Sequence, residues 1–187
     1  EIYNVYGLTE ASPRVSYLPP DEFDDNPTSV GVPLSSLKAK VVDNELLICG
    51  NNIMKGYYNN SKETARVKQD GWLHTGDVAE MDGQGRIYIK CRKDNMIIRA
   101  GMNIYPQEIE NAIKEDERII DVLAYGVKND TVSEKIHIKV VTTLSKSEVY
   151  NICKRKLLSY ELPDVIDIVA ELPKNASGKV IRSVKGN

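Results

Sequence analysis

The chain has 187 residues, of which 41% are hydrophobic, and this is enough for one or two domains with cores of their own. Its 25 Lys and Arg residues nearly balance its 27 Asp and Glu residues, which argues against a nucleic-acid partner. No apolar run reaches the length of a membrane-spanning helix, so we expect no membrane span.

The three cysteines, Cys49, Cys91 and Cys153, are odd in number and far apart in the sequence. This spacing fits neither a disulfide framework nor a zinc site, and it favours a reducing, cytoplasmic location. The chain begins without Met and runs within a few residues into a dense motif, so we expect it to be a piece of a longer polypeptide.

The first half of the chain is predicted to be mostly β-structure. Residues 37–42 and 45–49 are β-prone and flank Asp43-Asn44, a pair that suits a tight hairpin turn. Residues 78–81 and 86–90 repeat this pattern around a second turn.

The second half alternates between strands and helices. Pro106 suits the first position of a helix, and Ser145 followed by Glu148 is a capping-box pattern at the start of another. The expected strands are residues 96–99, 122–127, 136–142 and 165–169. The order β-α-β-β-α-β predicts a small α+β domain of about 90 residues. Between the halves, the polar residues 91–95 are either a solvated turn or a connection between two lobes.

Residues 6–10 place an aromatic ring, a glycine, a hydroxyl and a carboxylate close together, on Tyr6, Gly7, Thr9 and Glu10. Such a group can stack on a base, approach a phosphate and hold Mg²⁺ through oxygen ligands. A strand end followed by an ordinary loop is the alternative interpretation of the same residues.

Two further stretches carry candidate chemistry. Asp77 ends the motif of residues 72–77, just before an expected strand, where its two carboxylate oxygens can accept both hydroxyls of a ribose. Lys179 lies near the chain end in a loop of small residues, where it is either a solvated charge or a group that brings positive charge to a phosphate. The spacing of a Walker phosphate loop is absent from that segment.

Together and in this order, the motifs resemble the C-terminal part of the AMP-forming adenylating enzymes, the superfamily of acyl-CoA synthetases, peptide-synthetase adenylation domains and firefly luciferase. The resemblance covers nearly the whole chain. It rests on residues 4–10, 45–50, 56–58, 70–77, 85–88, 92–94, 104–110 and 173–179. One departure is Cys91, which stands where the family commonly has glycine before the ribose-binding Arg92.

The resemblance implies a role for each matching residue in the first half. Tyr6 would stack near adenine, Thr9 would contact the α-phosphate, and Glu10 would bind Mg²⁺. Asp77 would hold the ribose hydroxyls, with Arg92 also approaching the ribose.

In the second half, Asp94 matches the hinge position about which the family's small domain swings. Gly101 matches the segment that meets the pantetheine thiol of coenzyme A, and Lys179 matches the lysine needed for adenylation. The implied domains are residues 1–93, the end of the large adenylating domain, and residues 94–187, the small C-terminal domain.

By this resemblance the parent protein is a ligase that uses ATP, Mg²⁺ and coenzyme A to activate a carboxylic acid, with a fatty acid as the leading candidate. Nothing in the chain resembles the family's Ser/Thr/Gly-rich phosphate-gripping loop, so we expect the chain alone to be inactive. Two alternatives stay open. The chain can belong to an amino-acid-activating domain that loads a carrier protein, or it can be a non-catalytic interaction module with the same fold.

Overall fold

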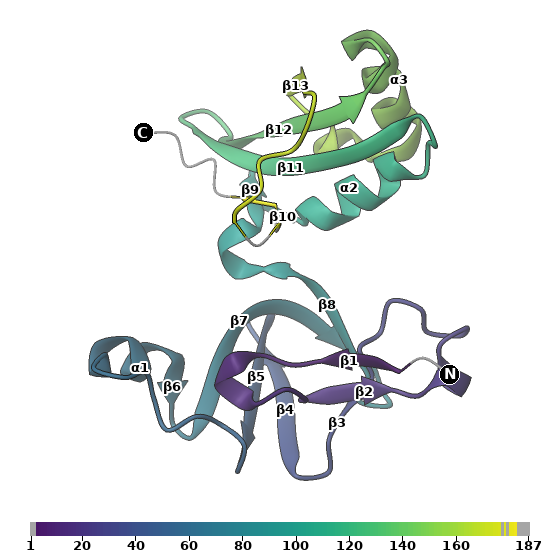
Figure 1. Cartoon of the computed structure of the whole chain (residues 1–187). Helices are drawn as coiled ribbons and strands as arrows, with labels where there is room; N and C mark the ends of the chain where they lie inside the picture. The colour runs from purple at the N-terminus through teal and green to yellow at the C-terminus, as the bar shows by residue number, and fades with distance from the viewer. Residues whose placement is uncertain (1–2, 177, 179, 183–187) are drawn as a thin grey trace. The chain divides into compact units, whose positions relative to one another are not determined.

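A computed structural model describes residues 3–176, 178 and 180–182 of the chain. The chain divides into two compact units, Glu1–Lys93 and Asp94–Asn187 (Figure 1). The division falls within the polar stretch 91–95, where a short 3-10 helix, η3 (Lys93–Asn95), forms. Both units combine strands with helices, and the α+β class predicted from the sequence is confirmed.

The first unit contains two antiparallel sheets. One has the order β1-β2-β3, and in the other the order is β4-β5-β7-β6 with β8 also paired to β7. The strands are β1 (Asn4–Tyr6), β2 (Ser16–Leu18), β3 (Val32–Pro33), β4 (Leu37–Val42), β5 (Glu45–Gly50), β6 (Lys68–Gln69), β7 (Trp72–Met81) and β8 (Ile87–Arg92). The helices are α1 (Ser61–Val67) and the 3-10 helices η1 (Thr9–Ala11) and η2 (Pro20–Glu22).

The predicted hairpin at residues 37–49 is present as β4 and β5. Asp43 and Asn44 have φ angles of +49° and +63°, the left-handed conformation that a tight two-residue turn between twisted strands requires. The pairing of Val42 with Glu45 closes this turn and places Glu45 at the buried start of β5.

Strand β7 is longer than predicted. The sequence indicates a strand only at residues 78–81, but β7 begins at Trp72 and pairs in turn with β6, β5 and β8. Two of its buried positions are occupied by polar residues, Thr75 and Asp77. The usual alternation of apolar and polar residues is therefore broken, and the strand cannot be recognised from hydrophobicity alone. Asp77 lies inside this strand, not before it.

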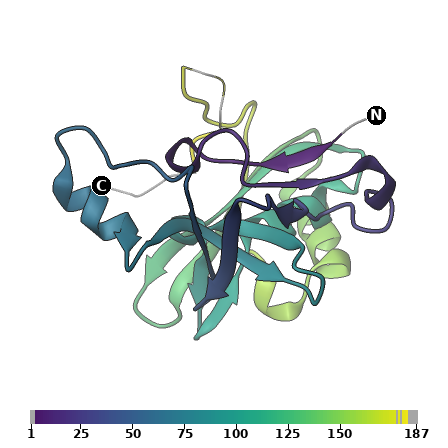
Figure 2. The same cartoon turned by 90° about the horizontal axis from the view of Figure 1, so that it is seen from below.

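The core of the first unit is formed mainly by buried apolar side chains from its strands, from η1 and from α1. Its buried apolar members are Ala11, Val15, Leu37, Leu46, Ile48, Val67, Leu73, Ala79 and Ile87. Helix α1 was not predicted, because it is seven residues long and buries only Val67. In both views it lies at the periphery of its unit (Figures 1 and 2).

The second unit is one sheet with two helices packed against it. The strand order is β10-β9-β12-β11, and β13 pairs in parallel with β12. The strands are β9 (Ile97–Arg99), β10 (Met102–Ile104), β11 (Ile119–Asn129), β12 (Ser133–Thr142) and β13 (Val165–Ile168). The helices are α2 (Pro106–Lys114), α3 (Lys146–Lys156) and the 3-10 helix η4 (Ser159–Glu161).

Both helices begin where the sequence predicts. Pro106 is the first residue of α2, and the helix buries Ile109 and Ile113 while packing along β11 (Figure 1). Ser145 and Glu148 form the capping box that starts α3. Strand β10 was missed because a three-residue hairpin strand carries too little pattern to be recognised. Across the part of the chain that the structure describes, no helix combines the length and apolar character that crossing a membrane requires.

Candidate active site

The loop after β1 contains the motif of residues 6–10, and a backbone hydrogen bond between its two ends closes it into a turn. The amide of Val15 donates to the carbonyl of Tyr6 at 2.8 Å and brings the chain back on itself. Gly7 sits inside this turn, and a Cβ at this position would lie 2.2 Å from the Pro13 carbonyl oxygen. Only glycine fits there, so the turn depends on the sequence motif itself.

Three predicted site residues, Tyr6, Asp77 and Arg92, meet in the first unit. The Tyr6 hydroxyl donates to Asp77 Oδ2 at 2.5 Å, and Arg92 Nη1 donates to Asp77 Oδ1 at 3.1 Å. Asp77 and Arg92 are direct partners across β7 and β8, which places their side chains on one face of the sheet. Asp77 is only 7% exposed, so its carboxylate is held in a fixed position.

Burial, followed by the charge of Asp77, raises the pKa of Tyr6 well above its ordinary value. Tyr6 therefore keeps its proton and donates to the carboxylate at any physiological pH. Arg92 makes a second bond, from Nη1 to the Thr75 carbonyl at 2.7 Å, which fixes the guanidinium beside Asp77.

Glycine is also required at position 76. Its φ angle is +70°, and a Cβ there would lie 2.7 Å from Arg92 Nη2. The guanidinium thus lies directly over the backbone of the 74–77 segment. Cys91, the departure noted in the sequence, is buried in β8 opposite Val78, next to a β-bulge where the register shifts between Val78 and Ala79, and its side chain is accommodated there.

Sequence analysis missed one carboxylate that supports this segment. Glu45 is 7% exposed, and its Oε1 accepts from the Gly76 amide at 3.0 Å. Its Oε2 accepts from Lys93 Nζ at 2.9 Å and lies 3.3 Å from His74 Nδ1. The available signal was a charged residue at the start of an otherwise apolar strand, within the segment 45–50 that is part of the resemblance.

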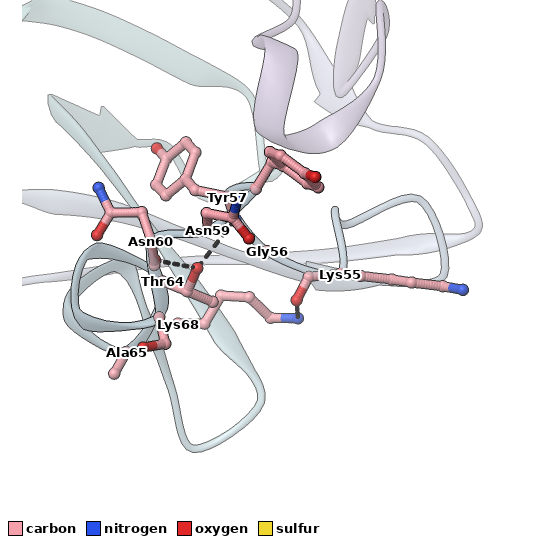
Figure 3. Close-up of a pocket in the computed structure, with 10 residues that line it drawn as sticks. Lys55, Gly56, Tyr57, Asn59, Asn60, Thr64, Ala65 and Lys68 are labelled. Carbon is pink, nitrogen blue, oxygen red and sulfur yellow. Dashed lines mark hydrogen bonds between the residues drawn. The ribbon is translucent and has the colours of Figure 1, made fainter.

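Glu10 lies in η1 and is half-buried, whereas its neighbour Thr9 is exposed. The Tyr57 hydroxyl donates to Glu10 Oε1 at 2.7 Å, and the amide of Met54 donates to the Glu10 carbonyl at 2.7 Å. Tyr57 also lines an open cavity of about 750 Å³ formed by residues 55–61, 64, 65 and 68 (Figure 3). The segment around Tyr57 therefore supports the one predicted metal-binding residue.

Among the described residues, no three His, Cys, Asp or Glu side chains cluster as a ready-made metal site. Mg²⁺ is commonly held by one or two carboxylates together with phosphate oxygens of a substrate. A half-buried carboxylate whose Oε1 is fixed by a hydroxyl fits that kind of shared site, so Glu10 is compatible with Mg²⁺.

The remaining predicted residues belong to the second unit. Asp94 is in η3, and Gly101 lies in the turn between β9 and β10 with a φ angle of +82° and no atom within 4 Å of a Cβ placed there. Lys179 lies outside the described residues. The ends of its loop are joined by the pairing of Lys174 with Val180 and by a bond of 2.8 Å from the Ile181 amide to the Pro173 carbonyl.

Two family models match the chain. Residues 1–58 match the model described as AMP-binding enzyme, and residues 108–179 match the AMP-binding enzyme C-terminal domain. Together the two matches cover well over half of the chain, in the order in which the family carries them. The chain belongs to the AMP-binding enzyme family.

Two curated relatives of this chain are named as CoA ligases. The long-chain-fatty-acid–CoA ligase of Escherichia coli O157:H7 is 37% identical over an alignment of 191 positions, which covers 95% of this chain and 34% of the relative. The 2-succinylbenzoate–CoA ligase of Listeria monocytogenes is 35% identical over an alignment of 181 positions, which covers 95% of this chain and 39% of the relative. The chain thus spans between 34% and 39% of the length of these relatives.

Two solved structures of similar fold contain an adenylate or ATP. The o-succinylbenzoate CoA synthetase of Bacillus subtilis in complex with its acyl-adenylate intermediate superposes with a TM-score of 0.91 at 29% identity, covering 99% of this chain and 41% of that one. The same synthetase with ATP and magnesium ion gives a TM-score of 0.89 at 29% identity, covering 97% and 40%.

Proposed function

We propose that this chain is the C-terminal portion of an AMP-forming acyl-CoA ligase. Residues 1–93 would be the end of the large adenylating domain, and residues 94–187 would be the small C-terminal domain. The observation that carries the proposal is the fixed group of Tyr6, Asp77 and Arg92 in the first unit. The names of the two relatives described above, both CoA ligases, support the reaction class.

In this proposal the chain binds the AMP part of the nucleotide. Asp77 accepts hydrogen bonds from the ribose hydroxyls, because each carboxylate oxygen has lone pairs beyond the one used by Tyr6 or Arg92. Arg92 lies beside the ribose and Tyr6 stacks near the adenine. Gly7 lets the backbone approach the nucleotide closely, and Thr9 contacts the α-phosphate.

The reaction has two steps. A carboxylate oxygen of the acid attacks the α-phosphorus of ATP, the bond to the β-phosphate breaks, and pyrophosphate leaves. The thiol sulfur of coenzyme A then attacks the acyl carbon and loses its proton, and AMP leaves. Glu10 holds Mg²⁺, which when bound neutralises phosphate charge, and Lys179 stabilises negative charge in the first step. Gly101 approaches the pantetheine in the second step, with Asp94 as the hinge.

We further propose a fatty acid as the substrate. Relatives named long-chain-fatty-acid–CoA ligase reach 37% identity, and the 2-succinylbenzoate ligase reaches 35%. The two values are close, so the chemical class of the acid has to be measured on the complete protein with acids of graded chain length.

Binding of an adenylate mimic to the 187-residue chain tests the proposed site. Isothermal titration with a non-hydrolysable acyl-sulfamoyl adenosine should show saturable binding. Asp77→Asn should weaken that binding by about tenfold or more, because it replaces a charged acceptor with a neutral amide. Asp70→Asn is the matched control, since Asp70 lies in an exposed turn before the same strand. An interaction module of the same fold would not bind the mimic, and equal binding by the Asp77 variant would contradict the ribose assignment.

A further inference from the structure

The segment 52–57, which carries Tyr57, forms hydrogen bonds to the backbone of η1. The amide of Met54 donates to the Glu10 carbonyl, and Asn52 Nδ2 donates to the Ala11 carbonyl at 2.6 Å. The Ser12 hydroxyl returns a bond to the Asn52 carbonyl at 3.3 Å. Residues 10–12 are therefore held from one side by a segment that lies about forty residues later in the sequence.

The same segment also contacts the side-chain carboxylate of Glu10. The hydroxyl of Tyr57 donates to Oε1 at 2.7 Å, and this bond raises the pKa of Tyr57. The ring of Tyr57 packs against the core of the first unit, so the hydroxyl is carried on a supported side chain. A hydrogen bond to one carboxylate oxygen restricts rotation of the carboxylate and leaves Oε2 as the oxygen for another partner.

Tyr57 is itself fixed by α1. Its amide donates to the Thr64 hydroxyl at 2.9 Å, and that hydroxyl donates to the Asn60 carbonyl at 2.9 Å (Figure 3). Gly56 permits this approach, because a Cβ there would lie 2.7 Å from the Thr64 methyl carbon. Lys68 Nζ donates to the Met54 carbonyl at 2.9 Å, which bonds the segment to the first residue of β6.

We infer that Tyr57 is a positioning residue for the Glu10 carboxylate, setting its orientation toward the cation that accompanies ATP. The inference rests on the proposed function, in which Glu10 is the metal-binding residue. Tyr57 acts through Glu10 alone. Removing an outer-shell partner of this kind typically weakens metal affinity by about 10- to 100-fold.

The test uses the complete protein encoded by the gene, with Mn²⁺ as the probe cation. Tyr57→Phe removes one oxygen atom and keeps the packed ring, so the fold is retained. Tyr58→Phe is the matched control, because Tyr58 is the next residue and is 93% exposed. In the presence of ATP, electron paramagnetic resonance of free Mn²⁺ should show about tenfold weaker binding for Tyr57→Phe and no change for Tyr58→Phe.

A double-mutant cycle separates positioning from a general structural effect. In a Glu10→Gln background, Tyr57→Phe should produce no further loss of Mn²⁺ binding. An equal loss in both backgrounds would show that Tyr57 acts independently of Glu10 and would overturn the inference.

Two other outcomes distinguish a failure of the inference from a failure of the proposed function. Wild-type Mn²⁺ binding by Tyr57→Phe, together with loss of binding by Glu10→Gln, would overturn the inference and leave the proposed function intact. Wild-type Mn²⁺ binding by Glu10→Gln would contradict the metal assignment in the proposed function, and the inference would fail with it.

Discussion

Glu45 shows how a single buried charge organises the candidate site. Burial by itself would raise its pKa, but the hydrogen bonds from Lys93, Gly76 and His74 outweigh burial, and the pKa is lowered. The carboxylate is therefore ionised at neutral pH and holds together residues from β7 and η3. These contacts fix the backbone that carries Asp77.

Glu45→Gln should destabilise the first unit in a pH-dependent way. At pH 7 we expect a loss of about 1–3 kcal/mol, because Lys93 and the Gly76 amide lose a charged acceptor. Because the pKa of Glu45 is lower in the folded state, its carboxylate stabilises the fold fully at pH values above its pKa in the unfolded state, about 4.3. This stabilisation is lost as the pH falls through the pKa of the folded state. Urea unfolding at pH 7 and near pH 4 measures the difference.

Glu80→Gln is the matched control for this measurement. Glu80 is exposed and pairs with Lys90 at the surface, so its replacement should change the free energy of unfolding by less than about 0.5 kcal/mol. A loss for Glu45→Gln that is the same at both pH values would show that the carboxylate charge is not responsible.

Lys179 is predicted to act in only one of the two half-reactions. In the complete protein, Lys179→Ala should slow adenylate formation by about 10²–10³, because an ammonium group no longer stabilises the developing phosphate charge. Thioester formation from supplied acyl adenylate should change far less. Lys179→Arg should rescue poorly, since a planar guanidinium presents its charge differently. Equal losses in the two half-reactions would mean that Lys179 supports the fold or a common binding step.

The sequence supplied most of the candidate site but not the residues that support it. Tyr6, Asp77 and Arg92 were selected from motifs, and the structure brings them into contact. Glu45 and Tyr57 were not selected, because their importance lies in hydrogen bonds to residues 31 and 47 positions away. Such contacts depend on strand pairing and loop packing, which short motifs do not contain.

At the level of elements, prediction succeeded where local chemistry is decisive. The capping box of α3, the proline that begins α2 and the Asp43-Asn44 turn are each determined by a few adjacent residues. Prediction was incomplete for β7, because Thr75 and Asp77 occupy buried positions for the sake of polar contacts. Helix α1 and strand β10 are too short to show a period.

The junction between the two units is predicted to be the first site of proteolysis. Limited trypsin digestion of the 187-residue chain should cut early after Arg92 or Lys93, because these residues lie at the boundary between two compact units and such connections are preferred sites of proteolysis. Both side chains are held by ion pairs, Arg92 with Asp77 and Lys93 with Glu45, so a local opening must precede cleavage. Mass spectrometry of the first fragments identifies the bond. Early cuts elsewhere, with this junction intact, would contradict the assignment of residues 92–94 as the hinge region.

At the scale of the whole molecule, the chain carries the proposed nucleotide-binding residues Tyr6, Asp77 and Arg92 but no segment resembling the family's phosphate-gripping loop. Positioning and charge stabilisation provide most of the acceleration in phosphoryl transfer, so part of a site should not catalyse it. The purified 187-residue chain should therefore not exchange labelled pyrophosphate into ATP. Robust exchange by this chain alone would show that it contains a complete adenylating site.

Analysis of the products formed by the complete protein tests the central claim most directly. The protein is incubated with a fatty acid, ATP, Mg²⁺ and coenzyme A, and nucleotides and thioesters are separated by chromatography. An AMP-forming acyl-CoA ligase should produce AMP, pyrophosphate and acyl-CoA in equal amounts, and only when the acid is present. Formation of ADP, or the absence of any acid-dependent AMP with carboxylic acids of several classes, would contradict the account.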